Sequence, residues 1–319
     1  MDHLDELGWN TERNPEGCRI WTDPSHPLYK DLQAFLSELD TYQGLVRDFA
    51  GINADLRELK RSSSSLNSTA ICDRVKLGSG GIKSIFSGSG QLSWSDSGYV
   101  EPLTTPMRHP RFCSDQEFLM DMNYMIHDFE AMCEKIQPHA TTVLIDMGAS
   151  LSYHNDQSNS LLHVDENPIT YLLKLYEKFG IRFDHIYGFE AKFTNPDEVY
   201  QSLLPEEYMS SYHWINTGVG HEPEGKLNPL HSILRKFKED DFVVIKLDID
   251  TAKIELPLAR QIFEDPSLSR RIDQFYFEHH VHMKEMAPIW RSAMKGTLKD
   301  TFELFHGLRQ RGVPAHFWV

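Results

Sequence analysis

Two carboxylates stand one residue apart at the end of an apolar run, in the sequence DFVVIKLDID at residues 241–250. The apolar centre of this run indicates a buried strand, so Asp248 and Asp250 are expected where the strand ends. Such an ending suits two chemistries. An Asp-x-Asp pair can hold a divalent metal against a diphosphate, and a single strand-end carboxylate can face a cofactor and an acceptor. Lys246, within the same strand, is expected to be a strand-edge residue or a carboxylate partner rather than a catalytic amine.

A second polar group ends the strand expected in RIDQFYFEHHVH, residues 271–282. Glu278, His280 and His282 share one face of this strand, because side chains alternate along an extended chain. Together with Asp248 and Asp250 they offer mixed nitrogen and oxygen ligands to a divalent metal. We favour the alternative, a polar strand end with hydrogen-bonded imidazoles and no metal. His280 is the candidate general base, because imidazole in general exchanges its proton near neutral pH.

Residues typical of a nucleoside site end the first two strands expected in the chain, in residues 143–150 and 184–191. VLIDMGAS, at 143–150, places Gly148 in a tight turn after Asp146, where no side chain blocks a ligand. Glu190, at the end of the next expected strand, has the acceptor oxygens that bind both hydroxyls of a ribose. This order favours a nucleoside site over a plain strand-to-helix turn. A dinucleotide site is disfavoured, because there is no complete Gly-x-Gly-x-x-Gly sequence.

Strand and helix patterns alternate from about residue 141 onward. This alternation predicts an α/β fold with a Rossmann-like, doubly wound and mostly parallel sheet over residues 141–319. Residues 1–140 have little strand pattern and are predicted to form a helical and loop-rich N-terminal extension. The expected strands lie near 141–148, 184–191, 212–220, 242–250, 271–282 and 314–319, and the expected helices near 167–180, 195–204, 229–240, 251–265 and 297–312.

Charge and hydropathy limit the classes of partner. The formal net charge of -15 argues against broad binding to nucleic acid or to an anionic membrane. No run of about 18 apolar residues predicts a transmembrane helix, and the N-terminus has no pattern of a signal peptide. The four cysteines match no zinc-binding spacing. We therefore expect a soluble protein. The sequence does not determine its compartment, and the cytoplasm is slightly favoured over a secretory lumen.

Five segments in chain order resemble the FkbM-type branch of the S-adenosylmethionine-dependent methyltransferases. They are VLIDMGAS, IYGFEA, WINTGVG, VVIKLDID and FYFEHHVH. The resemblance covers residues 141–319 and implies S-adenosylmethionine as the cofactor. Four departures stand out: Ser150 stands where the family has Asn, the second glycine of the family's first motif is absent, Asp250 and Thr251 replace a Glu-Gly pair, and only one strand follows the last helix, where the family has a hairpin.

The resemblance also implies a role for each strand-end residue. Asp146 and Gly148 would line the methionine end of the cofactor, next to Ser150, which stands where the family has Asn. Glu190 would hold the ribose. The two residues implied near the adenine are Asn216 and Thr217.

The acceptor side involves the last two of these strands. Asp248 would face both the cofactor's methyl group and the acceptor, while Glu278 and His280 would flank the acceptor. His280 or Asp248 would remove a proton from a hydroxyl, giving O-methylation of a sugar, polyol or secondary metabolite. Two other classes remain open. One is a metal-dependent glycosyltransferase that uses Asp248 and Asp250, and the other is a catalytically eroded binding or scaffold protein.

Overall fold

The computed structural model describes residues 24–25, 135, 139–150, 168–178, 181–280, 293–296, 300, 304–305, 307–308 and 311–318. The predicted N-terminal extension lies almost entirely outside these residues, as do the four cysteines and His282. Within the described part of the chain, no helix has both the length and the apolar character needed to cross a membrane.

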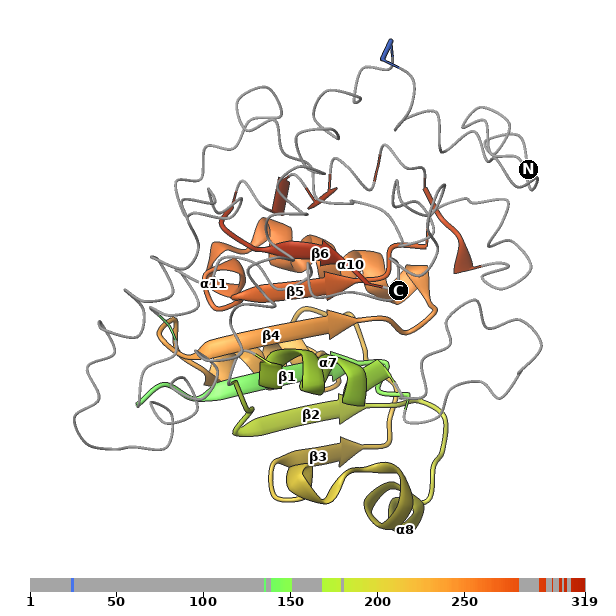
Figure 1. Cartoon of the computed structure of the whole chain (residues 1–319). Helices are drawn as coiled ribbons and strands as arrows, with labels where there is room; N and C mark the ends of the chain where they lie inside the picture. The colour runs from blue at the N-terminus through green and yellow to red at the C-terminus, as the bar shows by residue number, and fades with distance from the viewer. Residues whose placement is uncertain are drawn as a thin grey trace.

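Six parallel strands form a single sheet in the order β3-β2-β1-β4-β5-β6 (Figure 1). Parallel strands joined by helical crossovers confirm the predicted α/β fold, and the order is that of doubly wound, Rossmann-like sheets. The last strand pairs directly with β5 in parallel. The strands are β1 (Thr142–Met147), β2 (His185–Phe189), β3 (Tyr212–Ile215), β4 (Phe242–Leu247), β5 (Gln274–Phe277) and β6 (Ala315–Phe317).

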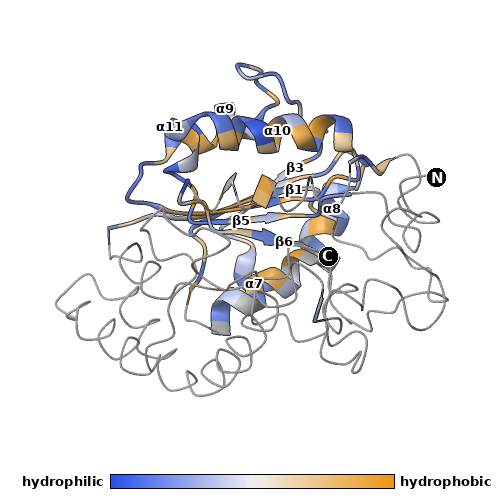
Figure 2. Cartoon of the chain, turned by 90° about the horizontal axis from the view of Figure 1, so that it is seen from above, coloured by the Kyte–Doolittle hydropathy of each residue, from blue (hydrophilic) through white to orange (hydrophobic). Residues whose placement is uncertain are grey.

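Helices cover both faces of the sheet (Figure 2). One face carries α7 (Pro168–Lys178), and the opposite face carries α9 (Pro229–Ser232), α10 (Ala252–Glu264) and α11 (Pro266–Ser269). The β2–β3 connection contains α8 (Pro196–Glu198), a π-helical turn η6 (Val199–Leu203) and a 3-10 turn η7 (Glu206–Tyr208), and η8 (Leu234–Lys236) follows α9.

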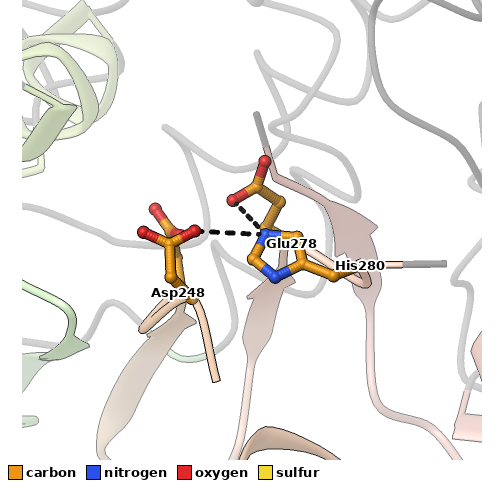
Figure 3. A group of neighbouring side chains, drawn as sticks. Asp248, Glu278 and His280 are labelled. Atoms are coloured by element: carbon orange, nitrogen blue, oxygen red, sulfur yellow. Dashed lines mark hydrogen bonds and ion pairs between the residues drawn. The ribbon is translucent and has the colours of Figure 1, made fainter. Parts of the chain in front are cut away.

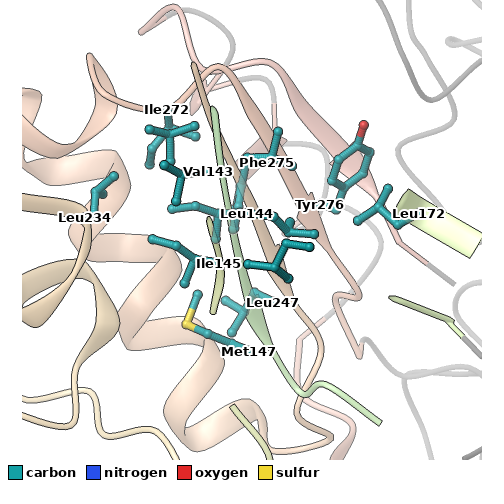
Figure 4. Close-up of a cluster of buried hydrophobic side chains, with 14 of the residues drawn as sticks. Val143, Leu144, Ile145, Met147, Leu172, Leu234, Leu247, Ile272, Phe275 and Tyr276 are labelled. Carbon is teal, nitrogen blue, oxygen red and sulfur yellow. The ribbon is translucent and has the colours of Figure 1, made fainter. Parts of the chain in front are cut away.

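The two central strands are buried along their whole length. Every residue of β1 and β4 is buried, as expected for strands covered on both faces. Their side chains alternate between the two layers: Val143 and Ile145 lie toward Leu234, whereas Leu144 lies toward Leu172 (Figure 4). This packing aligns the carboxyl ends of the strands at one edge of the sheet, where the candidate residues lie.

Asp273, just before β5, provides a test of this packing at the opposite edge. Its Oδ2 accepts the Val243 N–H at 2.8 Å, and its Oδ1 lies 3.3 Å from Lys135 Nζ. Burial raises the pKa of Asp273 to about 6, in spite of Lys135. Between the ordinary pKa of 3.8 and about 6, the folded chain therefore holds a proton that the unfolded chain has lost. Stability falls as the pH rises through that window.

Asp273→Asn keeps an acceptor for Val243 and removes the charge. We expect this variant to be about 1–3 kcal/mol more stable than the wild type at pH 7 and nearly equal to it at pH 4. Urea unfolding across this pH range measures the difference. A constant difference at all pH values would contradict the assignment of the proton to Asp273.

Candidate active site

A fully buried lysine, Lys246 of β4, lies among the polar residues at the carboxyl ends of β1 and β4. Lys246 Nζ is 3.0 Å from Asp146 Oδ1 and 3.2 Å from Asp248 Oδ2, and it donates a hydrogen bond of 3.0 Å to the Gly148 carbonyl. These three partners match the three N–H donors of an ammonium group. The Trp318 ring centre lies 5.5 Å away. Lys246 is therefore the expected carboxylate partner, and it joins the ends of β1 and β4.

The electrostatics of this triad favour an ion pair. Burial favours the neutral amine, but the carboxylates of Asp146 and Asp248 outweigh it and raise the pKa of Lys246. Burial likewise opposes ionisation of Asp248, yet Lys246 and a hydrogen bond from Glu278 lower its pKa. Burial raises the pKa of Asp146, and Lys246 opposes that rise. Asp248 is thus the carboxylate that stays ionised most readily.

Gly148 lies where the turn after β1 meets the end of β4. Its φ is +100°, and a Cβ built there would lie 1.6 Å from the backbone oxygen of Asp248. The N–H groups of Gly148 and Ala149 donate to the Phe189 carbonyl, and Ser150 N–H donates to the Gly148 carbonyl. The glycine is required by the close approach of the chain's own backbone. Contact of Gly148 and Ser150 with a cofactor stays a prediction.

Glu190 begins a loop that Asn216 holds from the neighbouring strand end. The Asn216 Nδ2 donates to the carbonyls of Glu190 and Lys192 at 2.8 and 2.7 Å, and its Oδ1 accepts the Thr194 N–H at 3.0 Å. Glu190 Oε1 accepts the Lys192 N–H at 2.6 Å. The Asn216 amide thus positions Glu190. The position of Asn216 and the adjacent Thr217 near an adenine stays a prediction.

Four of the five candidate metal ligands lie together beyond β4 and β5. Figure 3 shows Asp248, Glu278 and His280 side by side. In this four-residue cluster, made up of Asp248, Asp250, Glu278 and His280, one donor atom from each residue lies within 4.8 Å of all the others. His280 Nε2 is 2.8 Å from Glu278 Oε2 and 3.6 Å from Asp250 Oδ1. Burial and the nearby Asp248 charge raise the pKa of Glu278 well above its usual range. The fifth candidate, His282, is outside the described residues.

Exposure within this cluster is uneven. The side chain of His280 is fully buried, that of Asp248 is 18% exposed and that of Asp250 is 68% exposed. Asp250 also has a φ of +53°, a left-handed conformation that Asp and Asn adopt more readily than most residues. The cluster therefore meets solvent mainly through Asp250, because the side chains of Asp248 and Glu278 are only 18% and 12% exposed.

Glu255 is the polar residue of this region that the sequence did not single out. It lies in the first turn of α10 with 1% of its surface exposed. Its Oε1 accepts the Ile249 N–H at 2.9 Å, and its Oε2 lies 3.8 Å from His280 Nδ1. Burial raises the pKa of Glu255 to about 8. One signal was available: Glu255 falls at helical spacing with the buried Ala252, Leu258 and Ala259, on the apolar stripe of α10.

No family model, curated protein or solved structure matches this chain. Membership in the methyltransferase family therefore stays a prediction that rests on the five segments.

Proposed function

We propose that the chain is an S-adenosylmethionine-dependent methyltransferase that acts on a hydroxyl group of a sugar, polyol or secondary metabolite. The observation that carries this proposal is the position of Glu190. It follows β2 at the carboxyl edge of the sheet, next to β1, in a loop that Asn216 holds in place. In doubly wound sheets, ligands bind beyond this edge near the point where the strand order reverses, here between β1 and β4.

The Glu190 carboxylate has the acceptor capacity that a ribose needs. A carboxylate has about four acceptor positions, and the Glu190 carboxylate accepts the Lys192 N–H at one of them. Glu190 is half buried, so solvent reaches it. These features support hydrogen bonds from both ribose hydroxyls to Glu190.

Methyl transfer breaks the carbon–sulfur bond of the sulfonium and forms a carbon–oxygen bond, and the hydroxyl proton must leave. Alignment of donor and acceptor provides most of the catalysis in such a displacement. Of the two predicted catalytic residues, Asp248 has an exposed fraction of 18% and His280 has none. This difference favours Asp248 as the group that contacts the acceptor, with His280 behind it.

Calorimetric titration with S-adenosylhomocysteine tests the cofactor. We expect micromolar binding by the wild type and at least a tenfold loss in Glu190→Ala, because the ribose loses its acceptors. Glu206→Ala, an exposed glutamate in η7, is the matched control and should bind like the wild type. A folded wild-type protein that produces no binding heat would refute the proposal.

One observation favours a second candidate, a metal-dependent glycosyltransferase: Asp248 and Asp250 belong to the same four-residue cluster. This candidate requires binding of a UDP-sugar that depends on Mn²⁺. The same calorimeter separates the two, because a methyltransferase binds S-adenosylhomocysteine and has no need of the UDP-sugar. A protein that binds neither S-adenosylhomocysteine nor the UDP-sugar would favour the third alternative, a catalytically eroded binding or scaffold protein.

A further inference from the structure

The spacing of the four-residue cluster fits one coordination sphere. Its donor atoms lie within 4.8 Å of one another. Ligands bound about 2.1–2.4 Å from a divalent ion lie at most about 4.2–4.8 Å apart, twice the bond length. Only small side-chain adjustments would therefore bring Asp248, Asp250, Glu278 and His280 onto a single ion.

Glu255 provides an independent indication of a ligand. Its Oε2 is buried, has no hydrogen-bond partner among the described residues and is directed at His280 Nδ1 from 3.8 Å. A buried carboxylate oxygen without a partner is costly. Histidines that bind metals commonly donate their second ring N–H to a carboxylate, which fixes the ring and leaves the other nitrogen for the metal. Glu255 holds this position behind His280, whose Nε2 faces the other cluster residues.

The charges of this region also leave room for a cation. Asp248, Asp250, Glu278 and Glu255 bring four carboxyl groups to one imidazole and to the ammonium of Lys246. Asp146 shares that ammonium at 3.0 Å. Gathering acidic groups in a partly buried place is unfavourable unless cations neutralise them. In the metal-free chain, protons on Glu278 and Glu255 limit this charge, as the raised pKa of each carboxyl indicates, and a divalent ion would take the place of those protons.

We propose that Asp248, Asp250, Glu278 and His280 bind one first-row divalent cation, with Glu255 orienting His280. The donor set of three carboxylates and one imidazole matches Mn²⁺, which combines a preference for oxygen ligands with acceptance of a nitrogen. The exposed Asp250 side leaves coordination positions open to a ligand from solvent. Metal binding itself does not depend on the function proposed above.

One consequence does rest on the proposed methyl transfer. An acceptor hydroxyl bound to the ion would lose its proton to water more readily, because the ion stabilises the alkoxide. The alkoxide oxygen would then attack the methyl carbon, the carbon–sulfur bond would break with its electron pair going to sulfur, and S-adenosylhomocysteine, now an uncharged thioether at sulfur, would leave. The ion would thus promote deprotonation of the acceptor hydroxyl, a step in which His280 cannot contact the acceptor because its side chain is fully buried.

Titration of the full chain with Mn²⁺, followed by the electron paramagnetic resonance signal of the free ion, tests the site. We expect one bound ion per chain and at least tenfold weaker binding in Asp250→Asn. This change removes an exposed charge, and Asn tolerates the left-handed conformation of residue 250. Asp240→Asn, at an exposed position before β4, is the matched control and should bind like the wild type.

Glu255→Gln examines the positioning role. It keeps the shape of the side chain, so we expect the metal-free protein to stay folded while Mn²⁺ affinity falls about 10-fold to 100-fold. Absence of bound Mn²⁺ in the wild type, or equal affinity in wild type and Asp250→Asn, would overturn the metal site. Titration of the same samples with S-adenosylhomocysteine keeps the two proposals apart, since Mn²⁺ binding without nucleoside binding would refute only the methyltransferase.

Discussion

Gly148→Ala is expected to destabilise the fold by about 3–5 kcal/mol, because it combines a backbone strain with a collision. The new Cβ would lie 1.6 Å from the Asp248 backbone oxygen and 2.5 Å from its carbonyl carbon. Neither atom can rotate away as a side chain would, so the turn after β1 or the end of β4 must shift. Urea unfolding monitored by circular dichroism measures the loss.

Gly312→Ala is the matched control for this effect. Gly312 also has a positive φ, +81°, but nothing lies within 4 Å of a Cβ built there. The free energy of unfolding of this variant should fall only by the cost of placing alanine in the left-handed conformation, about 1–2 kcal/mol. Equal losses at the two positions would show that the contact between Gly148 and Asp248 does not constrain the fold.

Lys246→Met is expected to cost about 3–5 kcal/mol, because it leaves the Asp146 carboxylate buried without its cation. Asp146 and Lys246 are both fully buried, so water cannot replace the lost partner. The unpaired carboxyl of the variant should take up a proton as the pH falls. The stability deficit should therefore shrink on acidification, since a folded-state pKa above the unfolded value favours folding at low pH.

A double-mutant cycle tests the pairing directly. Asp146→Asn combined with Lys246→Met removes both charges, and we expect it to recover at least 1 kcal/mol relative to Lys246→Met alone. Denaturant unfolding of the four proteins gives the coupling energy. A single Lys246→Met change that costs under about 1 kcal/mol, or a coupling near zero, would show that this ion pair does not organise the strand ends.

The strands were predictable because buried parallel strands are continuous apolar runs. Residues 242–245 are such a run, and β4 begins with it and continues through Lys246 and Leu247, with Asp248 directly beyond its end. The two-residue alternation also placed Glu278 and His280 on one face, next to the strand that carries Asp248. The proximity of Asp248, Glu278 and His280 could thus be predicted from the alternation of side chains along a strand and from the parallel order of the strands.

Contacts between distant residues were not predictable in the same way. Gly148 meets Asp248 across 100 positions, and this contact depends on the register of β1 against β4. The approach of Glu255 to His280 depends on how α10 packs on the sheet, which periodicity does not specify. The bonds from the Asn216 amide to the Glu190 loop are likewise not specified by the strand pattern, and the place of Asn216 near the adenine stays a prediction.

The proposed cofactor site is tested most directly by a crystal structure of the chain grown with S-adenosylhomocysteine. We predict electron density for the nucleoside beyond the ends of β1 and β2. Its ribose hydroxyls should lie within hydrogen-bond distance of the Glu190 carboxylate, and its sulfur should face Asp248. A nucleoside bound away from these strand ends, or an edge without nucleoside density at a saturating concentration, would contradict the proposed function.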